Sequence, residues 1–173
     1  MDIPEQYMLD TTVFGHLVDG FFRLEDLPSD GQFWSTPVQW AELNRVPDSD
    51  IRKKLTDKFK GLIPGQKTIP AGFAFDIPGA GWDEGEWRQD GNLWHELKQE
   101  LDAPMAAAKP NMPVNEGKRK RKKDSNSRDA SIAEAAWFNG FTLITSDARL
   151  KAAAEKHGIK VFSPRKGNPS NTE

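Results

Sequence analysis

The chain of 173 residues contains no cysteine, which excludes disulfide bonds, thiolate metal sites and cysteine nucleophiles. Its three histidines show neither the His-x-His nor the His-Glu-x-x-His spacing of a zinc site. No apolar run approaches the roughly 20 residues of a membrane-spanning helix. Met1 to Glu5 has neither the basic nor the apolar region of a signal peptide. We therefore expect a cytoplasmic protein that does not insert into a membrane.

The formal net charge of −2 conceals an uneven distribution. One run of six basic residues carries +6, which leaves −8 for the rest of the chain: Lys118, Arg119, Lys120, Arg121, Lys122 and Lys123. An acidic body with a local basic run indicates contact with a polyanion, although an isolated run of this kind is more often only a solvated segment. Because the run lies shortly before Asp129, we predict that it binds nucleic acid beside a functional site.

Apolar runs and helical periods alternate towards both ends of the chain. Short apolar runs predict strands at 7–9, 32–35, 141–145 and 159–162. Helical spacing and capping residues predict helices at 11–18, 36–43, 48–61, 128–137 and 147–158. Strands that alternate with helices form a parallel sheet with helices on both faces. The predicted fold is therefore α/β, with three layers (α/β/α) and a mostly parallel central sheet.

The middle of the chain differs in composition, because residues 61–113 hold half of the prolines and half of the glycines. We predict one domain over residues 1–163 with a Pro/Gly-rich insertion at about 61–125, and a flexible tail at 164–173. Within the insertion, residues 84–101 are expected to form a helix and 104–123 a linker. Three tryptophans of this region could stack on bases, but their helical spacing favours a small core: Trp82, Trp87 and Trp94.

Four carboxylates stand at the edges of the predicted elements. Asp10 and Asp147 directly follow strands, Asp129 opens an Ala-rich helix, and Glu42 lies within a helix. Acids at the carboxyl ends of parallel strands converge in one crevice and repel each other unless a divalent cation lies among them. An all-oxygen site of this kind selects Mg²⁺ or Mn²⁺. Each aspartate alone could equally be a helix cap, and Glu42 a solvated residue; the four together favour a metal site.

The run Met8-Leu-Asp-Thr-Thr-Val13, the mid-helix Glu42 and the block from Arg128 to Asp147 together resemble the PIN-domain nucleases. In many bacteria these nucleases are the toxins of virulence-associated toxin–antitoxin pairs. The resemblance covers about residues 6–60 and 126–163. Thr12 departs from the family, which often has asparagine at this position.

The resemblance implies a metal-binding and catalytic set of Asp10, Glu42, Asp129 and Asp147. Thr145 is similar to the hydroxyl residue that supports the set, and Thr11 could donate to a ligand carboxylate. The implied protein is an endoribonuclease that uses Mg²⁺ or Mn²⁺, forms a homodimer, acts on RNA and binds a cognate antitoxin. One or two such ions held by carboxylates can activate a water and neutralise the transition state of phosphodiester hydrolysis.

Other readings of the acids and of two neighbouring charges stay open. The chain could be a PIN-like module that binds nucleic acid without cleaving it, or a nuclease directed at DNA. A receiver-like phosphoacceptor domain expects paired acids after the first strand, and Asp10 has no adjacent acid. Asp124 could be a fifth ligand but is expected to be a solvated charge. Arg149 could contact a phosphate but is expected to lie on a helix surface.

Overall fold

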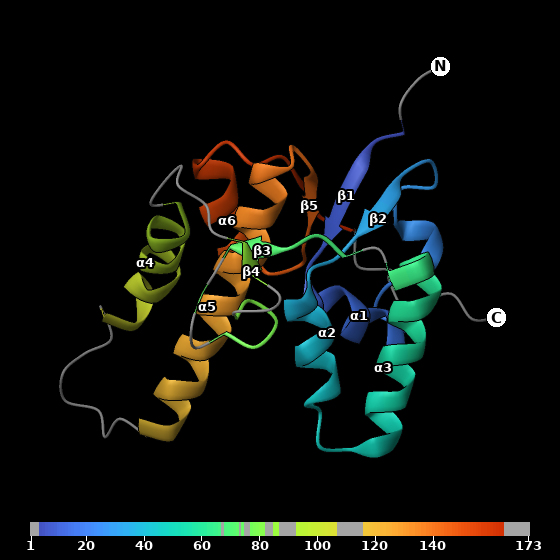
Figure 1. Cartoon of the computed structure of the whole chain (residues 1–173), viewed down its shortest axis with the longest axis horizontal. Coiled ribbons are helices and arrows are strands. Elements are labelled where there is room, and N and C mark those ends of the chain that lie inside the picture. Colours follow the sequence, from blue (N-terminus) through green and yellow to red (C-terminus); the bar gives the residue numbers. More distant parts are fainter. Residues whose placement is uncertain are drawn as a thin grey trace.

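The computed structural model describes residues 4–66, 68–72, 74, 77–81, 85–86, 93–106 and 116–164. The chain forms its elements in the following order (Figure 1): β1 (Gln6–Leu9), α1 (Thr11–Val18), η1 (Leu24–Asp26), β2 (Gln32–Trp34), α2 (Pro37–Asn44), α3 (Ser49–Leu62), η2 (Pro64–Gln66), β3 (Ala71–Gly72), β4 (Gly85–Glu86), α4 (Leu93–Ala106), α5 (Glu116–Phe138), β5 (Thr142–Ile144), α6 (Ala148–Lys156) and β6 (Val161–Phe162). None of the described helices is long and apolar enough to cross a membrane.

The central sheet has four strands in the order β2-β1-β5-β6, and all neighbouring strands are parallel. From β1 the chain passes outward to β2 on one side, and from β5 it passes outward to β6 on the other. The sheet therefore changes its direction of winding between β1 and β5. In open parallel sheets, the crevice at the carboxyl ends of such a strand pair is where ligands bind.

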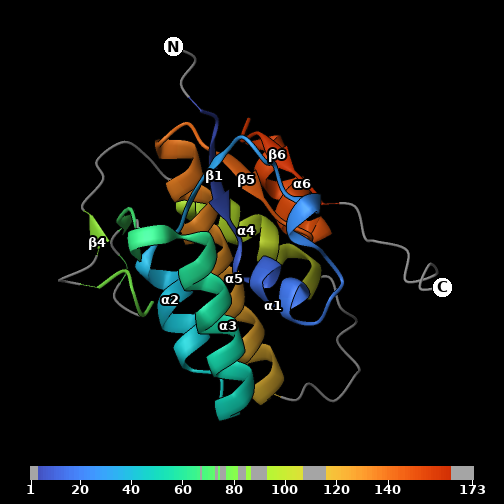
Figure 2. The same ribbon diagram turned by 90° about the vertical axis from the view of Figure 1, so that its right-hand side faces the viewer.

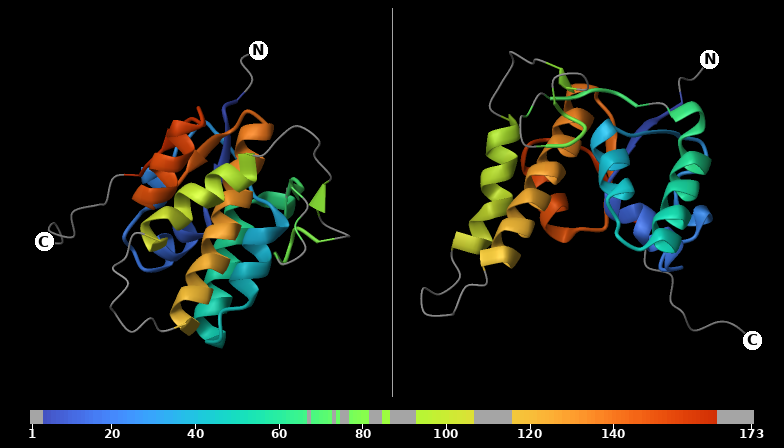
Figure 3. Two further views of the ribbon diagram at one scale, coloured as in Figure 1. Left: turned by 90° about the vertical axis from the view of Figure 1, so that its left-hand side faces the viewer. Right: turned by 60° about the horizontal axis from the view of Figure 1, so that its bottom comes forward.

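Two apolar cores cover the two faces of this sheet. Successive residues of a strand point to opposite faces; Met8 accordingly packs in one core, and Tyr7 and Leu9 in the other. The first core is completed by helices α4, α5 and α6, and the second by α1 and α3. The views in Figures 2 and 3 show these helices on either side of the strands. The predicted three-layer α/β fold with a parallel sheet is confirmed.

Helix α2 is docked onto the end of β1 through its first turn. Thr36 caps the helix and Pro37 occupies its first position, an arrangement that suits a helix start. The fully buried Gln39 donates a hydrogen bond from Nε2 to the backbone oxygen of Leu9, at 2.8 Å. This contact places Glu42, one turn further along α2, beside the carboxyl end of β1.

The structure corrects the sequence prediction in the middle of the chain. Residues 85–86 form a strand where a helix was expected, and helix α4 starts only at Leu93 and extends to Ala106. Helix α5 starts at Glu116, so the basic run 118–123 is helical rather than part of a linker. Residues 107–115, Trp82, Trp87 and residues 165–173 of the predicted tail lie outside the described residues.

Packing explains the difference at α5. Lysine and arginine are good helix formers, and the buried Asn126 of α5 donates a hydrogen bond to the backbone oxygen of Leu101 in α4. Trp94 of α4 donates from Nε1 to the Ser131 hydroxyl of α5, at 2.9 Å. These contacts between distant segments hold the middle of α5 against α4. The capping signal at Asp129 is overridden, and Asp129 lies inside the helix.

Candidate metal centre

Asp10 lies at the carboxyl end of β1, at the point where the sheet changes direction. Its backbone N–H donates to the oxygen of Ile144 in β5 (2.9 Å), and its side chain is almost fully buried. Oδ2 accepts hydrogen bonds from Thr12 Oγ1 (2.5 Å) and Thr145 Oγ1 (2.9 Å). Oδ1 is buried and has no hydrogen-bond partner among the described residues. A buried carboxylate oxygen without a partner is costly, so this atom fits a ligand position.

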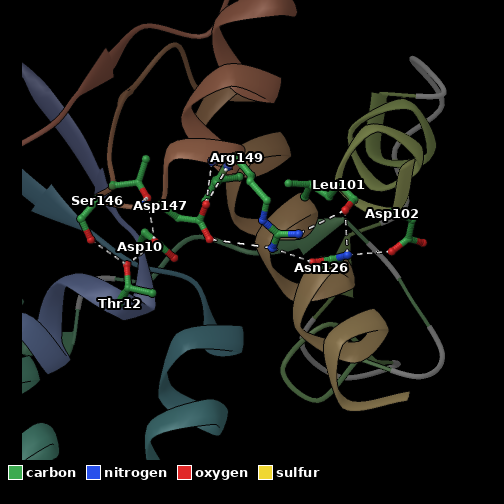
Figure 4. A network of polar contacts seen from close by, with 10 residues as sticks. Asp10, Thr12, Leu101, Asp102, Asn126, Ser146, Asp147 and Arg149 are labelled. Carbon is green, nitrogen blue, oxygen red and sulfur yellow. Dashed lines mark hydrogen bonds and ion pairs between the residues drawn. The ribbon is translucent and has the colours of Figure 1, made fainter. Parts of the chain in front are cut away.

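Asp147 follows β5 and is the N-cap of α6. Its Oδ1 accepts from the backbone N–H groups of Arg149 (2.7 Å) and Leu150 (3.2 Å), as a cap does. Its Oδ2 lies 3.9 Å from a guanidinium nitrogen of Arg149. Figure 4 shows Asp10 and Asp147 close to each other, with Thr12 and Ser146 beside them. Asp147 is therefore a cap and a member of the acidic group at the same time.

Glu42 and Asp129 approach the same crevice from helices α2 and α5. Glu42 Oε1 lies 3.2 Å from Nε of Arg128, whereas Oε2 is buried without a hydrogen-bond partner among the described residues. The Asp129 side chain is only 9 % exposed, and no described residue donates a hydrogen bond to it. The Asp129 carboxylate is therefore buried without a hydrogen bond from a described residue that would stabilise its charge.

The charges of Asp10, Glu42 and Asp147 all act on Asp129, so the four acids lie near one another. Burial, as the largest cause, and then the charges of Asp10, Glu42 and Asp147 raise the pKa of Asp129 to about 8, while Arg128 lowers it. Burial also raises the pKa of Asp10 to about 6; the hydrogen bonds from the two threonines lower it, and the charges of Glu42 and Asp147 raise it again. A bound cation would relieve this repulsion.

The four carboxylates do not form a closed cage. Among the described residues, no group of three or more acidic or imidazole side chains is already arranged around a metal position. Mg²⁺ tolerates such a site because it usually keeps several waters and takes only one or two carboxylates directly. The two unpaired buried oxygens, Asp10 Oδ1 and Glu42 Oε2, and the all-oxygen donor set fit this cation and Mn²⁺.

The hydroxyl contacts differ in part from the expectation. Thr145 donates to Asp10, as a supporting hydroxyl would, and also accepts from the backbone N–H of Asp147, at 3.0 Å. The contact assigned to Thr11 is made instead by Thr12, and Thr11 Oγ1 has no hydrogen-bond partner among the described residues. The reason is local, because the residue two positions after the acid turns back towards it in the first turn of α1.

The sequence analysis did not predict a series of polar side-chain contacts that leads to Asp10. His16 Nδ1 lies 2.9 Å from Ser146 Oγ, which lies 3.5 Å from the Thr12 hydroxyl that donates to Asp10. It also missed the ion pair between Arg128 and Glu42. The only signal for these contacts was the position of Ser146 and Arg128 directly beside two of the predicted acids.

Of the basic run, Arg121, Lys122 and Lys123 are exposed on α5, and the side chains of residues 118–120 lie outside the described set. Asp124 is exposed too. Arg149 is half-buried rather than a free surface residue. Its guanidinium donates to Asn126 Oδ1 (3.3 Å) and to the oxygen of Leu101 (3.5 Å), and so links α6 to α5 and α4 (Figure 4).

Comparison with known proteins supports the fold. No family model matches the chain, and no curated protein sequence matches it. Among solved structures it is similar to VapBC2 from Rickettsia felis bound to a DNA fragment from their promoter, with 16 % identity, a TM-score of 0.50, and coverage of 91 % of this chain and 98 % of that chain. A domain of a functionally unknown protein from Methanocaldococcus jannaschii has the same identity and TM-score, over 98 % of this chain and 96 % of that chain. VapBC-5 from Mycobacterium tuberculosis has 18 % identity but a TM-score of 0.42, over 94 % and 99 %. At these identities the likeness concerns the fold alone.

Proposed function

We propose that the protein is a metal-dependent endoribonuclease of the PIN type. The observation that carries this proposal is the convergence of Asp10, Glu42, Asp129 and Asp147. Four different parts of the chain bring these acids to the carboxyl ends of β1 and β5, where burial and then their mutual charges raise the pKa of Asp10 and Asp129. Such a group costs stability when no cation is bound, whereas a divalent cation held there would activate a water for phosphodiester hydrolysis and neutralise the transition state.

The acidic side chains and the residues that contact them have different roles in this proposal. Asp10 and Glu42 would hold Mg²⁺ or Mn²⁺ through their unpaired oxygens, together with Asp129 and with Asp147 Oδ2, which lies 3.9 Å from Arg149. When bound, the cation supplies an activated water and neutralises charge on the phosphate. Thr12 and Thr145 fix the orientation of Asp10 through its other oxygen, and the two backbone N–H groups at the start of α6 fix Asp147.

The partners proposed from the family resemblance are RNA, a cognate antitoxin and a second copy of the chain. The shared fold with VapBC2, whose solved structure contains promoter DNA, is in keeping with a toxin–antitoxin role. The exposed cations Arg121, Lys122 and Lys123 on α5 suit a polyanionic substrate. A cytoplasmic location and a single domain over residues 1–163 belong to the same proposal.

Cleavage of single-stranded RNA in Mg²⁺ or Mn²⁺ tests the proposal. We expect Asp10→Asn, Glu42→Gln, Asp129→Asn and Asp147→Asn each to slow hydrolysis by roughly 100-fold or more, because each removes a ligand charge from a shared site. Asp57→Asn, which removes an exposed acid from α3 outside both the acidic group and its neighbouring helix α5, is the control and should cleave normally. Wild-type rates in both Asp10→Asn and Asp129→Asn would refute the site. DNA of the same sequence shows whether RNA is preferred.

A further inference from the structure

A pocket of about 500 Å³ lies beside the acidic group. Its described walls come from the end of α2, from Ala74, Ile77 and Pro78, and from helices α4 and α5, which lie side by side in Figure 3. Arg128 belongs to both sites, because it lines the pocket and its Nε lies 3.2 Å from Glu42 Oε1. A ligand in the pocket would therefore lie next to the carboxylates.

The charges of the pocket favour an anionic ligand. Arg45 and Lys123 line it, are exposed, and form no ion pair with any described residue. Lys98 also lines it but is paired with Asp102 at 2.6 Å. Asp124 is the one carboxylate among the described lining residues. Two cations are thus available at the pocket rim, whereas Arg128 is paired with Glu42.

The inner wall of the pocket is aromatic and firmly held. The Trp94 indole donates from Nε1 to the Ser131 hydroxyl (2.9 Å) and to the backbone oxygen of Ser127 (3.2 Å). The His95 ring lies beside it, with ring centroids 4.9 Å apart. Flat rings next to cations are the combination that single-stranded nucleic acids use, because bases stack on the rings while phosphates pair with the cations.

We propose that this pocket binds a nucleotide next to the scissile phosphodiester of a single-stranded substrate. Arg45 and Lys123 pair with its phosphate, and its base lies against Trp94. This inference rests on the proposed function, since it takes the acidic group as the cleaving centre. Lys123 and Asp129 are six residues apart on α5, about 9 Å along the helix axis. The pocket and the acidic group therefore contact neighbouring nucleotides of one strand.

Binding without cleavage tests the pocket directly. Fluorescence anisotropy with a labelled single-stranded RNA octanucleotide in EDTA would compare the full chain with its Arg45→Ala/Lys123→Ala variant over a series of salt concentrations. Each phosphate contact on single strands contributes about 0.7 to the log–log salt slope. The double variant should therefore show a slope shallower by about 1.4 and, at 0.1 M salt, roughly 25-fold weaker binding. Lys53→Ala/Lys160→Ala removes the same charge from exposed positions outside the pocket, and should bind like the wild type.

Three results would overturn parts of the inference. An equal salt slope in both double variants would show that Arg45 and Lys123 do not contact the phosphate. An acidic peptide of equal charge that binds as tightly, with the same dependence on these two residues, would make the ligand a protein segment. If a strand with abasic sites binds as tightly as the intact strand, the base does not contact Trp94.

The pocket and the proposed cleaving centre can fail separately. If the four acid variants keep cleaving but the salt slopes of RNA binding differ as expected, the proposed cleaving centre is wrong. The pocket is then still supported as a site for single-stranded nucleic acid. If the acid variants lose cleavage but the salt slopes are equal, the proposed nucleotide pocket is wrong and the proposed nuclease function is still supported. Thermal unfolding of each double variant shows that the exposed substitutions leave the fold intact.

Discussion

Replacing Asp129 with asparagine should stabilise the metal-free protein at neutral and alkaline pH. Burial and the charges of three neighbouring acids raise the pKa of Asp129 from its usual 3.8 to about 8. The folded protein therefore binds a proton between these two values that the unfolded chain releases. The stability of the metal-free fold must fall as pH rises from about 4 to about 8, because the slope has the sign of the difference in bound protons.

The size of the expected loss in unfolding free energy follows from the pKa shift of Asp129. Each unit of pKa difference corresponds to about 1.36 kcal/mol, so the full shift sets an upper limit of about 6 kcal/mol. Water entry and small movements around a buried charge reduce such penalties, and we expect roughly 2–4 kcal/mol between pH 5 and pH 9. Asparagine has nearly the same shape and no charge, so its unfolding free energy should lack most of this decline.

Urea unfolding in EDTA at several pH values measures the effect. The wild type should lose stability from pH 5 to pH 9, and Asp129→Asn should follow a flatter curve that lies higher at pH 8 and above. Asp124→Asn removes an exposed acid from the same helix and should follow the wild type. Parallel curves for the wild type and Asp129→Asn would refute the reasoning, because Asp129 would then carry no penalty.

Three further outcomes are expected. Thr145→Val removes a donor that lowers the pKa of Asp10, so the pKa should rise further and Mn²⁺ affinity should fall roughly tenfold by calorimetric titration; unchanged affinity would contradict this role. Asn126→Ala leaves the Arg149 guanidinium and the Leu101 oxygen without this partner, and should cost about 1–3 kcal/mol of unfolding free energy. A change below 0.5 kcal/mol would count against the link between α4, α5 and α6. Neutralising Lys118 to Lys123 should make the salt slope of RNA binding shallower by about 0.7 per lost contact. Because successive side chains of a helix point in different directions, two to four contacts are expected rather than six, and an unchanged slope would mean that the run contacts no RNA.

The ends of the chain were predictable because their signals are local. Short apolar runs followed by capped amphipathic helices place β1, α1, β5 and α6 within one or two residues of the expected positions. Asp10 and Asp147 followed from the same pattern, since each is the polar residue that ends an apolar strand. The alternation of strands and helices was sufficient to predict the parallel sheet.

Contacts between distant segments were not predictable. Helix α5 starts at Glu116 and its Asn126 donates to Leu101 of α4, whereas the capping signal at Asp129 pointed to a later start. The ion pair between Glu42 and Arg128 joins residues 86 positions apart and leaves no local pattern. The choice of Thr12 over Thr11 depends on the direction of a side chain in the first turn of α1, which spacing alone does not decide.

The position of Asp129 inside a helix, rather than at its start, bears on function. At a helix start, free N–H groups and the helix dipole would stabilise the carboxylate and lower its pKa. Inside α5, no described residue donates to it, and although Arg128 lowers its pKa, the pKa stays at about 8. A carboxylate in this environment needs an external cation to stay ionised at neutral pH. In the Asp129→Asn variant, the gain in metal-free stability should therefore coincide with a loss of stabilisation by Mn²⁺, which for the wild type amounts to about 2.7 kcal/mol at 100 times the dissociation constant. A variant that shows the gain but keeps the full Mn²⁺ effect would make Asp129 a buried acid without a part in metal binding.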